Sequence, residues 1–259
     1  MKKTIRKVIN SVGFDVVKIK TGAKTIKTKQ LTLYKTVTGN YYLPSDAGAD
    51  TVAQTIINNQ IFEKDVVDLA TKYIKKGTAV LDIGANFGQM SVLFSQLTGD
   101  NGKVYSFDAD DFIFEILKKN IEANNRKNIN PIFGAVHNKP NEVLVFPEQD
   151  FIEFQTYGSY GIDYNASKGR KVTSLTIDNL NIKEDISFMK IDIQGGDLQA
   201  MEGAIKTIQK NQMPILFEYE YHFEEKFNMK FQQYVDFVAS INYKFERVIN
   251  GHNFLIIPK

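Results

Sequence analysis

Residues 80–90, Val-Leu-Asp-Ile-Gly-Ala-Asn-Phe-Gly-Gln-Met, form the segment that decides the fold of this chain. An apolar run ends in Asp82, the turn residues Gly84 and Gly88 follow, and Met90–Leu97 is amphipathic. This order is typical of a buried parallel strand, a tight turn and a helix. Glycines let a backbone approach a ligand where a Cβ would clash, and a helix start offers unpaired N–H groups. The segment therefore predicts a nucleotide-type cofactor loop at the carboxyl end of a strand.

The spacing of this loop indicates which cofactor it binds. It reads D-x-G-x-x-x-G, which is neither the G-x-G-x-x-G of dinucleotide enzymes nor the G-x-x-x-x-G-K-[ST] of phosphate-binding loops. An acid before the first glycine would repel a pyrophosphate but suits a ligand with a cationic amine and a sulfonium, such as S-adenosylmethionine. A second acid is then expected at the end of the next strand, about twenty residues on, to accept from ribose hydroxyls. Asp108 stands there, after the short strand Lys103–Phe107.

These two acids define a set of expected cofactor-binding residues. The alternative is that each acid only closes a turn or caps a helix, as Asp110 and Asp111 are expected to do for the helix Phe112–Asn124. The combination with the glycines favours the cofactor. The expected cofactor-binding residues are Asp82, Gly84, Ala85, Asn86, Gly88, Gln89, Asp108 and Ala109.

Several ordered motifs resemble those of the FkbM-type S-adenosylmethionine-dependent O-methyltransferases. Leu81–Gly88 is similar to motif I of that family, and Val104–Asp108 is similar to its ribose-binding strand, although the family usually has Glu-Pro where this chain has Asp108-Ala109. The resemblance covers about residues 41–257 of the chain. Its other motifs are Leu117–Asn124, Ser174–Leu180, Met189–Asp197 and Pro214–Glu218.

The resemblance implies an activity, and the chain departs from the family pattern at two positions. It implies methyl transfer from S-adenosylmethionine to a hydroxyl of a small molecule or glycan. Gln194 and Asp197 stand where the family generally carries glutamates, so the acceptor here is expected to differ if those positions serve it. Methyl transfer to nitrogen is an alternative, although the sequence lacks the Asn/Asp-Pro-Pro-Tyr run that amino-methylating enzymes use. A non-catalytic cofactor-binding module is another, which the two departures would support.

Strands and helices alternate after residue 60, which predicts an α/β fold built from βαβ units. We expect a Rossmann-like seven-stranded methyltransferase sheet in the order 3-2-1-4-5-7-6. Its last two strands are expected to form a hairpin at Asn250-Gly251. The expected strands are Ala79–Ile83, Lys103–Phe107, Pro131–Val136, Ser187–Ile193, Ile215–Tyr219, Tyr243–Val248 and Phe254–Ile257.

The first sixty residues are expected to form a small β/α appendage, with the methyltransferase domain over 61–259. Short antiparallel strands are expected at Val17–Lys20, Leu31–Tyr34 and Gly39–Leu43, followed by helices over Asp50–Asn58 and Glu63–Lys75. Residues 1–30 hold nine basic residues against one acid, a net charge of +8 in a chain of +2 overall. This segment is either a solvated edge, where lysines discourage strand pairing, or an arm for an anionic partner such as a membrane surface or a phosphorylated glycan carrier.

Residues 147–171 are expected to form a long loop that is rich in aromatic and small residues. A loop of this length in a compact domain is usually a lid or a binding segment, and aromatic faces suit a sugar. The alternative is a crossover whose aromatic side chains pack into the core.

A hydroxyl acceptor requires a general base close to the methyl group. The candidates lie at the carboxyl ends of the fourth and fifth strands: Asp192, with Lys190 on the same face, and Glu218. Lys190 and Asp192 could instead form an internal ion pair. Asp192 and Glu218 could instead hold Mg²⁺, although two carboxylates are too few to establish a metal site. His137 follows a strand and is expected at the surface.

The amino-acid composition excludes several kinds of chemistry and indicates the location of the protein. The chain has no cysteine, which excludes disulfides and thiolate catalysis, and its three histidines form no H-x-x-x-H pair. It has no apolar run long enough for a membrane span and no apolar segment after its basic start, so we expect a cytoplasmic protein. No nucleic-acid-binding motif accompanies the basic segment, and we expect no nucleic-acid partner. The oligomeric state is left open by the sequence.

Overall fold

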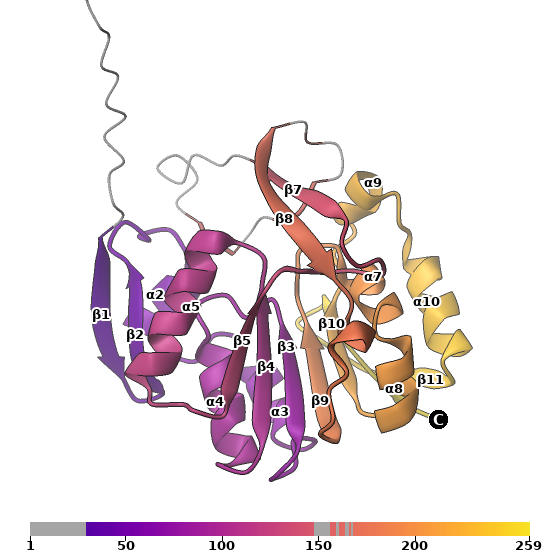
Figure 1. Ribbon diagram of the computed structural model, residues 1–259, viewed down its shortest axis with the longest axis horizontal. Helices are drawn as coiled ribbons and strands as arrows, with labels where there is room; N and C mark the ends of the chain where they lie inside the picture. Colours follow the sequence, from indigo (N-terminus) through magenta and orange to yellow (C-terminus); the bar gives the residue numbers. More distant parts are fainter. Residues whose placement is uncertain (1–29, 148–155, 159–160, 164–165, 167) are drawn as a thin grey trace, which may run out of the picture.

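One mostly parallel sheet of seven strands organises the computed structural model of the chain, which describes residues 30–147, 156–158, 161–163, 166 and 168–259 (Figure 1). The strand order is β5-β4-β3-β9-β10-β12-β11; β12 pairs antiparallel with both of its neighbours, β10 and β11, and the other pairs are parallel. Counted from β3 as strand one, this is the predicted order 3-2-1-4-5-7-6, with the hairpin at Asn250-Gly251. The strands are β3 (Ala79–Ile83), β4 (Lys103–Asp108), β5 (Ile129–Phe133), β9 (Ile186–Ile191), β10 (Ile215–Glu218), β11 (Tyr243–Ile249) and β12 (Asn253–Pro258).

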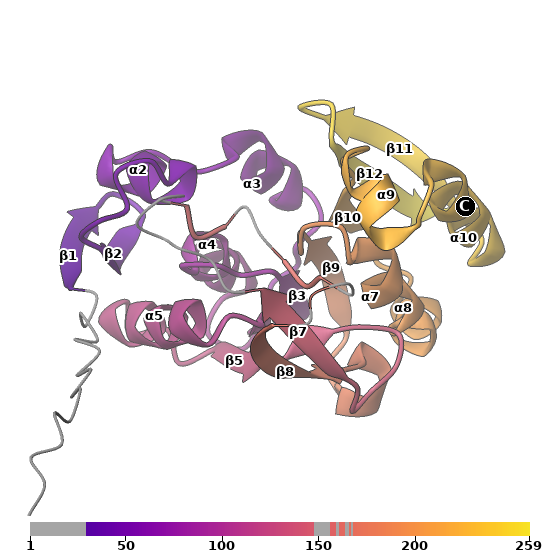
Figure 2. The ribbon, with the colours of Figure 1, turned by 90° about the horizontal axis from the view of Figure 1, so that it is seen from above.

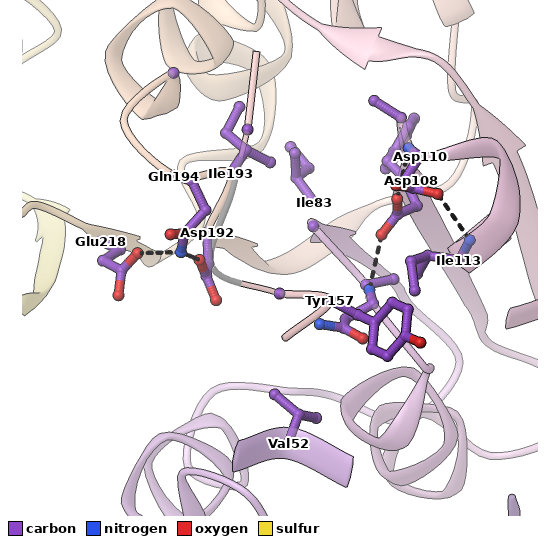
Figure 3. A pocket seen from close by; sticks show the side chains of 18 of the residues that line it. Val52, Ile83, Asp108, Asp110, Ile113, Tyr157, Asp192, Ile193, Gln194 and Glu218 are labelled. Atoms are coloured by element: carbon purple, nitrogen blue, oxygen red, sulfur yellow. Dashed lines mark hydrogen bonds between the residues drawn. The ribbon is translucent and has the colours of Figure 1, made fainter. Parts of the chain in front are cut away.

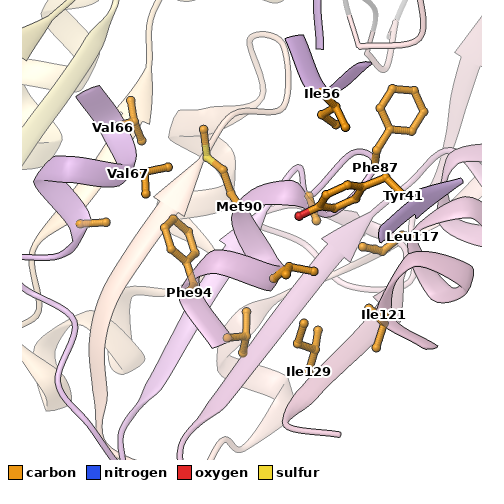
Figure 4. Packing of buried hydrophobic residues seen from close by; sticks show 14 of the residues in the cluster. Tyr41, Ile56, Val66, Val67, Phe87, Met90, Phe94, Leu117, Ile121 and Ile129 are labelled. Carbon is orange, nitrogen blue, oxygen red and sulfur yellow. The ribbon is translucent and has the colours of Figure 1, made fainter. Parts of the chain in front are cut away.

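Helices cover both faces of this sheet (Figures 1 and 2). On β3, Val80 faces one hydrophobic cluster, while Leu81 and Ile83 face the other, as the alternation of side chains along a strand requires. The first cluster packs under α2 (Thr51–Ile57), α3 (Lys64–Ala70), α4 (Gln89–Thr98) and α5 (Asp111–Ala123), and Figure 4 shows part of it. The second packs under α7 (Asp197–Glu202), α8 (Ile205–Asn211) and α10 (Phe231–Ser240). Two short helical segments, η1 (Ile177–Leu180) and α9 (Phe223–Phe227), complete the helices of the described residues.

The N-terminal hairpin of β1 (Leu31–Thr36) and β2 (Gly39–Pro44) matches two of the predicted strands and docks on α5. Its backbone is held by the side chains of Asn120 in that helix and of Asn124 at its C-cap. Asn120 accepts from the N–H of Tyr42 at 2.6 Å, and Asn124 accepts from the N–H of Asn40 at 2.8 Å. The predicted strand Val17–Lys20 and the basic segment up to Lys29 lie outside the described residues. A domain boundary near residue 60 stays a prediction.

Two predicted elements are wrong in their limits. The strand expected over Pro131–Val136 is two strands, β5 and β6 (Ala135–Val136), because Gly134 at φ +147° turns the chain out of the main sheet. The helix expected over Glu63–Lys75 ends at Ala70.

The region expected to be a loop at 147–171 is framed by a strand pair. β7 (Val143–Pro147) and β8 (Gly169–Leu175) run antiparallel, with Pro147 opposite Gly169, and β8 also pairs with β6. These three strands form a separate small sheet, which lies at the carboxyl end of the main sheet in Figure 1. Of the aromatic residues expected there, Tyr157 is described and is buried against Phe87 and Phe112. No helix among the described ranges is long and apolar enough to cross a bilayer.

Candidate active site

A cavity of about 490 Å³ opens at the carboxyl ends of β3, β4, β9 and β10. The glycine loop and Asp108 line one part of it, and Asp192, Gln194 and Glu218 line another (Figure 3). Open α/β sheets bind their ligands at this edge, and a volume of this size suits a drug-sized molecule.

The glycine loop approaches the end of β9 so closely that a side chain is excluded. A Cβ at Gly84, where φ is +83°, would lie 1.8 Å from the backbone oxygen of Asp192. Gly88, at φ +85°, is the N-cap of α4. The backbone N–H groups of Gly84 and Ala85 both donate to the oxygen of Phe107, at 3.0 and 2.8 Å. These two N–H groups therefore hold the loop on β4 and are not directed at a ligand.

Asp108 lies at the end of β4 beside this loop. One carboxylate oxygen accepts from the N–H of Asn86 at 3.0 Å, and the other accepts from the N–H of Asp110 at 2.9 Å. Burial raises the pKa of Asp108 to about 7, against the lowering effect of these two N–H groups. Asp110 caps α5 as predicted, because its side chain accepts from the N–H groups of Phe112 and Ile113. Asp108 is thus the strand-end acid that remains directed into the cavity, beside Ala109.

Asp82 is fully buried between α4 and β9. Its Oδ2 accepts from the Ser91 hydroxyl at 2.5 Å, and its Oδ1 lies 3.9 Å from the Lys190 Nζ. Burial raises the pKa of Asp82, and the Lys190 ammonium opposes this effect. Oδ1 has no hydrogen-bond partner among the described residues. The side chain therefore faces the Lys190 ammonium.

Gln89 is engaged with the N-terminal segment. Its amide oxygen accepts from the N–H of Phe62 at 2.9 Å, and its amide nitrogen donates to the oxygen of Gln60 at 2.9 Å. Gln89 lines the cavity, but its side chain holds the 60–62 segment in place, so a contact with a cofactor would use its backbone.

The three predicted catalytic residues come together at the ends of β9 and β10. The Lys190 Nζ lies 3.3 Å from Asp192 Oδ2 and donates to the backbone oxygen of Gly84 at 2.9 Å. The Gln194 amide nitrogen donates to Asp192 Oδ1 at 3.2 Å and to Glu218 Oε2 at 3.1 Å. Figure 3 shows Gln194 between the two carboxyl groups.

The charges of this cluster differ strongly from one residue to the next. Burial would raise the pKa of Asp192, but the Lys190 ammonium and hydrogen bonds from Glu218 and Gln194 lower it. Burial, followed by the charge of Asp192, raises the pKa of Glu218. Burial disfavours the charged form of Lys190, but Asp192 and Asp82 outweigh it and raise the pKa. At neutral pH the cluster therefore holds an ionised Asp192, a protonated Glu218 and a charged Lys190.

Asp197 lies beneath this cluster and is fully buried. Its Oδ1 accepts from the backbone N–H of Glu218 at 3.3 Å, whereas Oδ2 has no hydrogen-bond partner within the described ranges. Burial and then the charge of Asp192 raise the pKa of Asp197 to about 7. Asp197 therefore supports the position of Glu218 and does not reach the cavity.

His137 and Tyr157 are among the cavity residues that were not predicted as site residues. His137 was expected at the surface, but it is only 8% exposed and lines the cavity, where its backbone N–H donates to the oxygen of Leu175 in β8 at 2.8 Å. Tyr157 lines the cavity and is tied to the N-terminal segment: its N–H donates to Asp50 at 2.7 Å and its hydroxyl bonds Asp46 at 2.8 Å. No local sequence pattern predicts these contacts of His137 and Tyr157, because each contact joins residues that are far apart in the chain.

The donor set at Asp192 and Glu218 does not favour a metal ion. An amide N–H₂ group lies between the two carboxyls and an ammonium lies beside them, and both groups repel a cation. No group of three or more metal-ligating side chains is found among the described residues.

The residues of the cavity fit S-adenosylmethionine. The glycine turn lines the cavity and packs against the end of β9, Asp108 offers a carboxylate at the end of the second strand, and the adjoining acids suit a cationic ligand. A sheet in this strand order with this loop and this acid defines the class of S-adenosylmethionine-dependent methyltransferases.

Comparison with known families agrees with this class. The family model described as the methyltransferase FkbM domain matches residues 82–245. That match covers more than half of the chain, and the chain belongs to the FkbM methyltransferase family, as its motifs predicted. A second model, described as protein-L-isoaspartate(D-aspartate) O-methyltransferase, matches residues 17–137.

Individual relatives share shorter segments with this chain. A ribosomal protein L11 methyltransferase from Dictyoglomus turgidum is 40% identical over 58 residues, which are 22% of this chain and 19% of that protein. A fibrillarin-like rRNA/tRNA 2′-O-methyltransferase from Pyrobaculum aerophilum is 28% identical over 130 residues, 47% of this chain and 52% of that protein. The crystal structure of a methyltransferase FkbM from Methylobacillus flagellatus, at 18% identity and a TM-score of 0.47, covers 70% of this chain and 43% of that chain. The chain thus spans about half or less of the length of these relatives.

Proposed function

We propose that this chain transfers the methyl group of S-adenosylmethionine to a hydroxyl group of a small molecule or glycan. The observation that carries the proposal is the position of Asp192, an ionised carboxylate that lines the same cavity as the glycine loop and Asp108. Its side chain is 23% exposed, so an acceptor can reach it. A hydroxyl acceptor must lose a proton during transfer, and a carboxylate at this place can take it.

Each polar residue of the cluster has a separate part in the proposed reaction. S-adenosylmethionine, when bound, supplies an electrophilic methyl carbon. Asp192 orients the acceptor hydroxyl and accepts its proton. Lys190 keeps Asp192 ionised and fixes its direction through contacts to Asp192 and to the glycine loop. Glu218, in its protonated form, donates a hydrogen bond to Asp192 and lines the acceptor part of the cavity.

The residues that we propose to bind the cofactor line the part of the cavity formed by the glycine loop and the end of β4. Asp108 accepts from the ribose hydroxyls, and Gly84 and Gly88 let the loop pack against Asp192 and Leu117 so that its backbone lines the cavity. Ala85, Asn86 and Ala109 line the same wall, with Gln89 contributing its backbone and Asp82 its negative field. This division places the cofactor on the first two strands and the acceptor on the fourth and fifth.

The relatives support methyl transfer but differ in their acceptors. Their names specify a ribosomal protein in one case and an RNA 2′-hydroxyl in another. A hydroxyl acceptor is favoured here by the cavity, because a carboxylate base is provided for a proton that an oxygen nucleophile must lose.

The test is transfer of a tritiated methyl group from S-adenosylmethionine into fractionated lysate, with glycan, lipid, protein and RNA fractions kept separate. The matched control is Asp192→Asn, which keeps the cavity shape but lacks the base. Label in a small-molecule or glycan fraction that requires Asp192 supports the proposal. Label only in protein or RNA, or equal label with the control variant, contradicts it.

A further inference from the structure

The acceptor part of the cavity contains Gln194, one of the two departures from the family motif, to which the proposed reaction assigns no role. Its side-chain amide nitrogen is the group that joins the two strand-end carboxyls, at 3.2 Å from Asp192 Oδ1 and 3.1 Å from Glu218 Oε2. We propose that Gln194 is a positioning residue whose amide holds Asp192 and Glu218 as a pair that shares a single proton. This inference rests on the proposed function where it treats Asp192 as the base.

The backbone at Gln194 is in a conformation that a residue with a side chain seldom adopts. Its φ is +58°, and the next residue, Gly195, follows at φ +98°. A left-handed conformation at a residue other than glycine is strained and persists where the surroundings enforce it. Glycine would adopt this backbone conformation with less strain than glutamine does. We attribute the presence of a side chain at residue 194 to its contact with both carboxyls.

The loop around Gln194 is enclosed on two sides, which keeps the amide in place. A Cβ on Gly161 would lie 3.1 Å from the Gln194 Cβ, and a Cβ on Gly195 would lie 2.5 Å from the Phe227 ring. The loop is therefore packed between Gly161 and helix α9. A side chain that is fixed in this way loses little further freedom on aligning its neighbours.

The chemistry of an amide at this position differs from that of a carboxylate. An amide N–H₂ group donates to both carboxyls and adds no charge. Asp192 faces the Lys190 ammonium, whereas Glu218 has no cation partner among the described residues, and two carboxyls joined through one amide nitrogen are not both ionised at neutral pH. With Gln194 the pair needs one proton, and Glu218 carries it while Asp192 remains available as the base. A third carboxylate at residue 194 would need a second proton and would compete with Asp192 for it.

The first experiment measures protonated carboxyl groups and needs no acceptor. Infrared spectra at pH 8 would be compared for wild type, Gln194→Glu and Gln209→Glu, whose new carboxyl lies on the exposed face of α8. We expect Gln194→Glu to gain absorbance of protonated carboxyl relative to wild type, and Gln209→Glu to gain carboxylate absorbance only. Calorimetric binding of S-adenosylhomocysteine confirms that each variant is folded. Equal spectra for the two variants would overturn the proposal.

The second experiment tests positioning in the reaction. Gln194→Met keeps the length of the side chain but cannot donate, so Asp192 loses a hydrogen bond that lowers its pKa. We expect kcat to fall about 10- to 100-fold, within the range of a weakened acid–base step, and the acidic limb of its pH profile to move to higher pH. The KM for S-adenosylmethionine should stay within about twofold, because the cofactor lies on other strands.

The two experiments separate this inference from the proposed function. If wild type transfers no methyl group to any hydroxyl acceptor while the infrared result holds, the proposed function fails and the shared proton stands. If transfer occurs but the pH profile of Gln194→Met equals that of wild type, the positioning role fails and the proposed function stands.

Discussion

The carboxylate of Asp108 accepts a hydrogen bond from the backbone N–H of Asn86 at 3.0 Å, which joins the end of β4 to the glycine loop after β3. Its other oxygen accepts from the N–H of Asp110 at the start of α5. Asp108 therefore fixes the relative positions of the loop and the helix while it lines the cavity. A ligand that donates hydroxyls to this carboxylate meets an acceptor that is already oriented.

Asp108→Ala should weaken binding of S-adenosylhomocysteine by about 1–3 kcal/mol, the cost of leaving polar partners unmatched. The fold should remain, because Asp110 still caps α5 through the N–H groups of Phe112 and Ile113. Calorimetry measures the affinity, and circular dichroism checks the fold. Asp111→Ala is the matched control, since it removes the same charge at an exposed position nearby. Equal affinities for the two variants would show that Asp108 only supports the loop.

The affinity for S-adenosylhomocysteine should fall as the pH decreases below about 7. Burial raises the pKa of Asp108 to about 7 in the free protein, and the proposed ribose contacts require the ionised form. Bound hydroxyl donors lower this pKa, so binding releases a proton at pH values below 7. Calorimetry in buffers of different ionisation enthalpy should detect that proton. Asp108→Ala should show a flatter pH dependence, and an unchanged profile in this variant would assign the titration to another group.

The main sheet could be predicted because each of its central strands is a local apolar run that ends in an acid or a glycine. β3 was predicted at its observed limits, and β4, β9 and β10 were predicted to within two residues at each end. The break at Gly134 was missed because the chain leaves one sheet and enters another, and the partner strand β8 lies about forty residues later in the sequence. The local sequence pattern contains no information on which of the two sheets a strand joins.

The candidate site was predictable in part for the same reason. Asp82, Asp108 and Glu218 lie in the last two residues of their strands, Asp192 directly follows β9, and parallel strands bring their carboxyl ends to one edge. The contacts that orient these side chains could not be predicted. Gln194 bridges to Glu218 on the next strand, Tyr157 reaches back to Asp50, and Gln89 turns toward Phe62. Each of these contacts depends on how separate segments pack.

The free energy of unfolding should decrease as the pH increases, because Asp197 ionises in the folded protein. Its pKa is raised to about 7 by burial, so the folded state holds a proton that the unfolded state releases near pH 4. The stabilisation from this proton is complete below about pH 4 and is lost as the pH rises through about 7.

Asp197→Asn cannot ionise, so this variant should not show the decrease in stability with pH that is caused by Asp197. Between pH 5 and pH 8.5, we expect the free energy of unfolding of wild type to fall relative to the variant, on the order of 2–4 kcal/mol. Urea unfolding at the two pH values measures the difference. Asp185→Asn, at an exposed position, is the control and should follow wild type. A constant difference between wild type and Asp197→Asn at both pH values would contradict the raised pKa.

Removal of divalent cations should leave methyl transfer unchanged. The amide of Gln194 and the ammonium of Lys190 occupy the positions around Asp192 that a cation would need. The initial rate should be the same in EDTA and after addition of Mg²⁺ or Mn²⁺, within about twofold. A rate that is lost in EDTA and restored by either metal would make Asp192 and Glu218 metal ligands.

The final prediction concerns the base. Asp192→Asn should reduce kcat by about 10²–10⁴, the usual range for loss of an acid–base group. Affinity for S-adenosylhomocysteine should remain near that of wild type, because the proposed cofactor contacts lie on β3 and β4. The variant also leaves Lys190 with Asp82 as its remaining carboxylate partner, so its thermal stability should be measured beside the rate. Glu218→Gln is the matched comparison: it keeps a donor for Asp192 and should lower kcat less. If Asp192→Asn turns over normally, the pair of Lys190 and Asp192 is a structural ion pair, and Glu218 becomes the better candidate for the base.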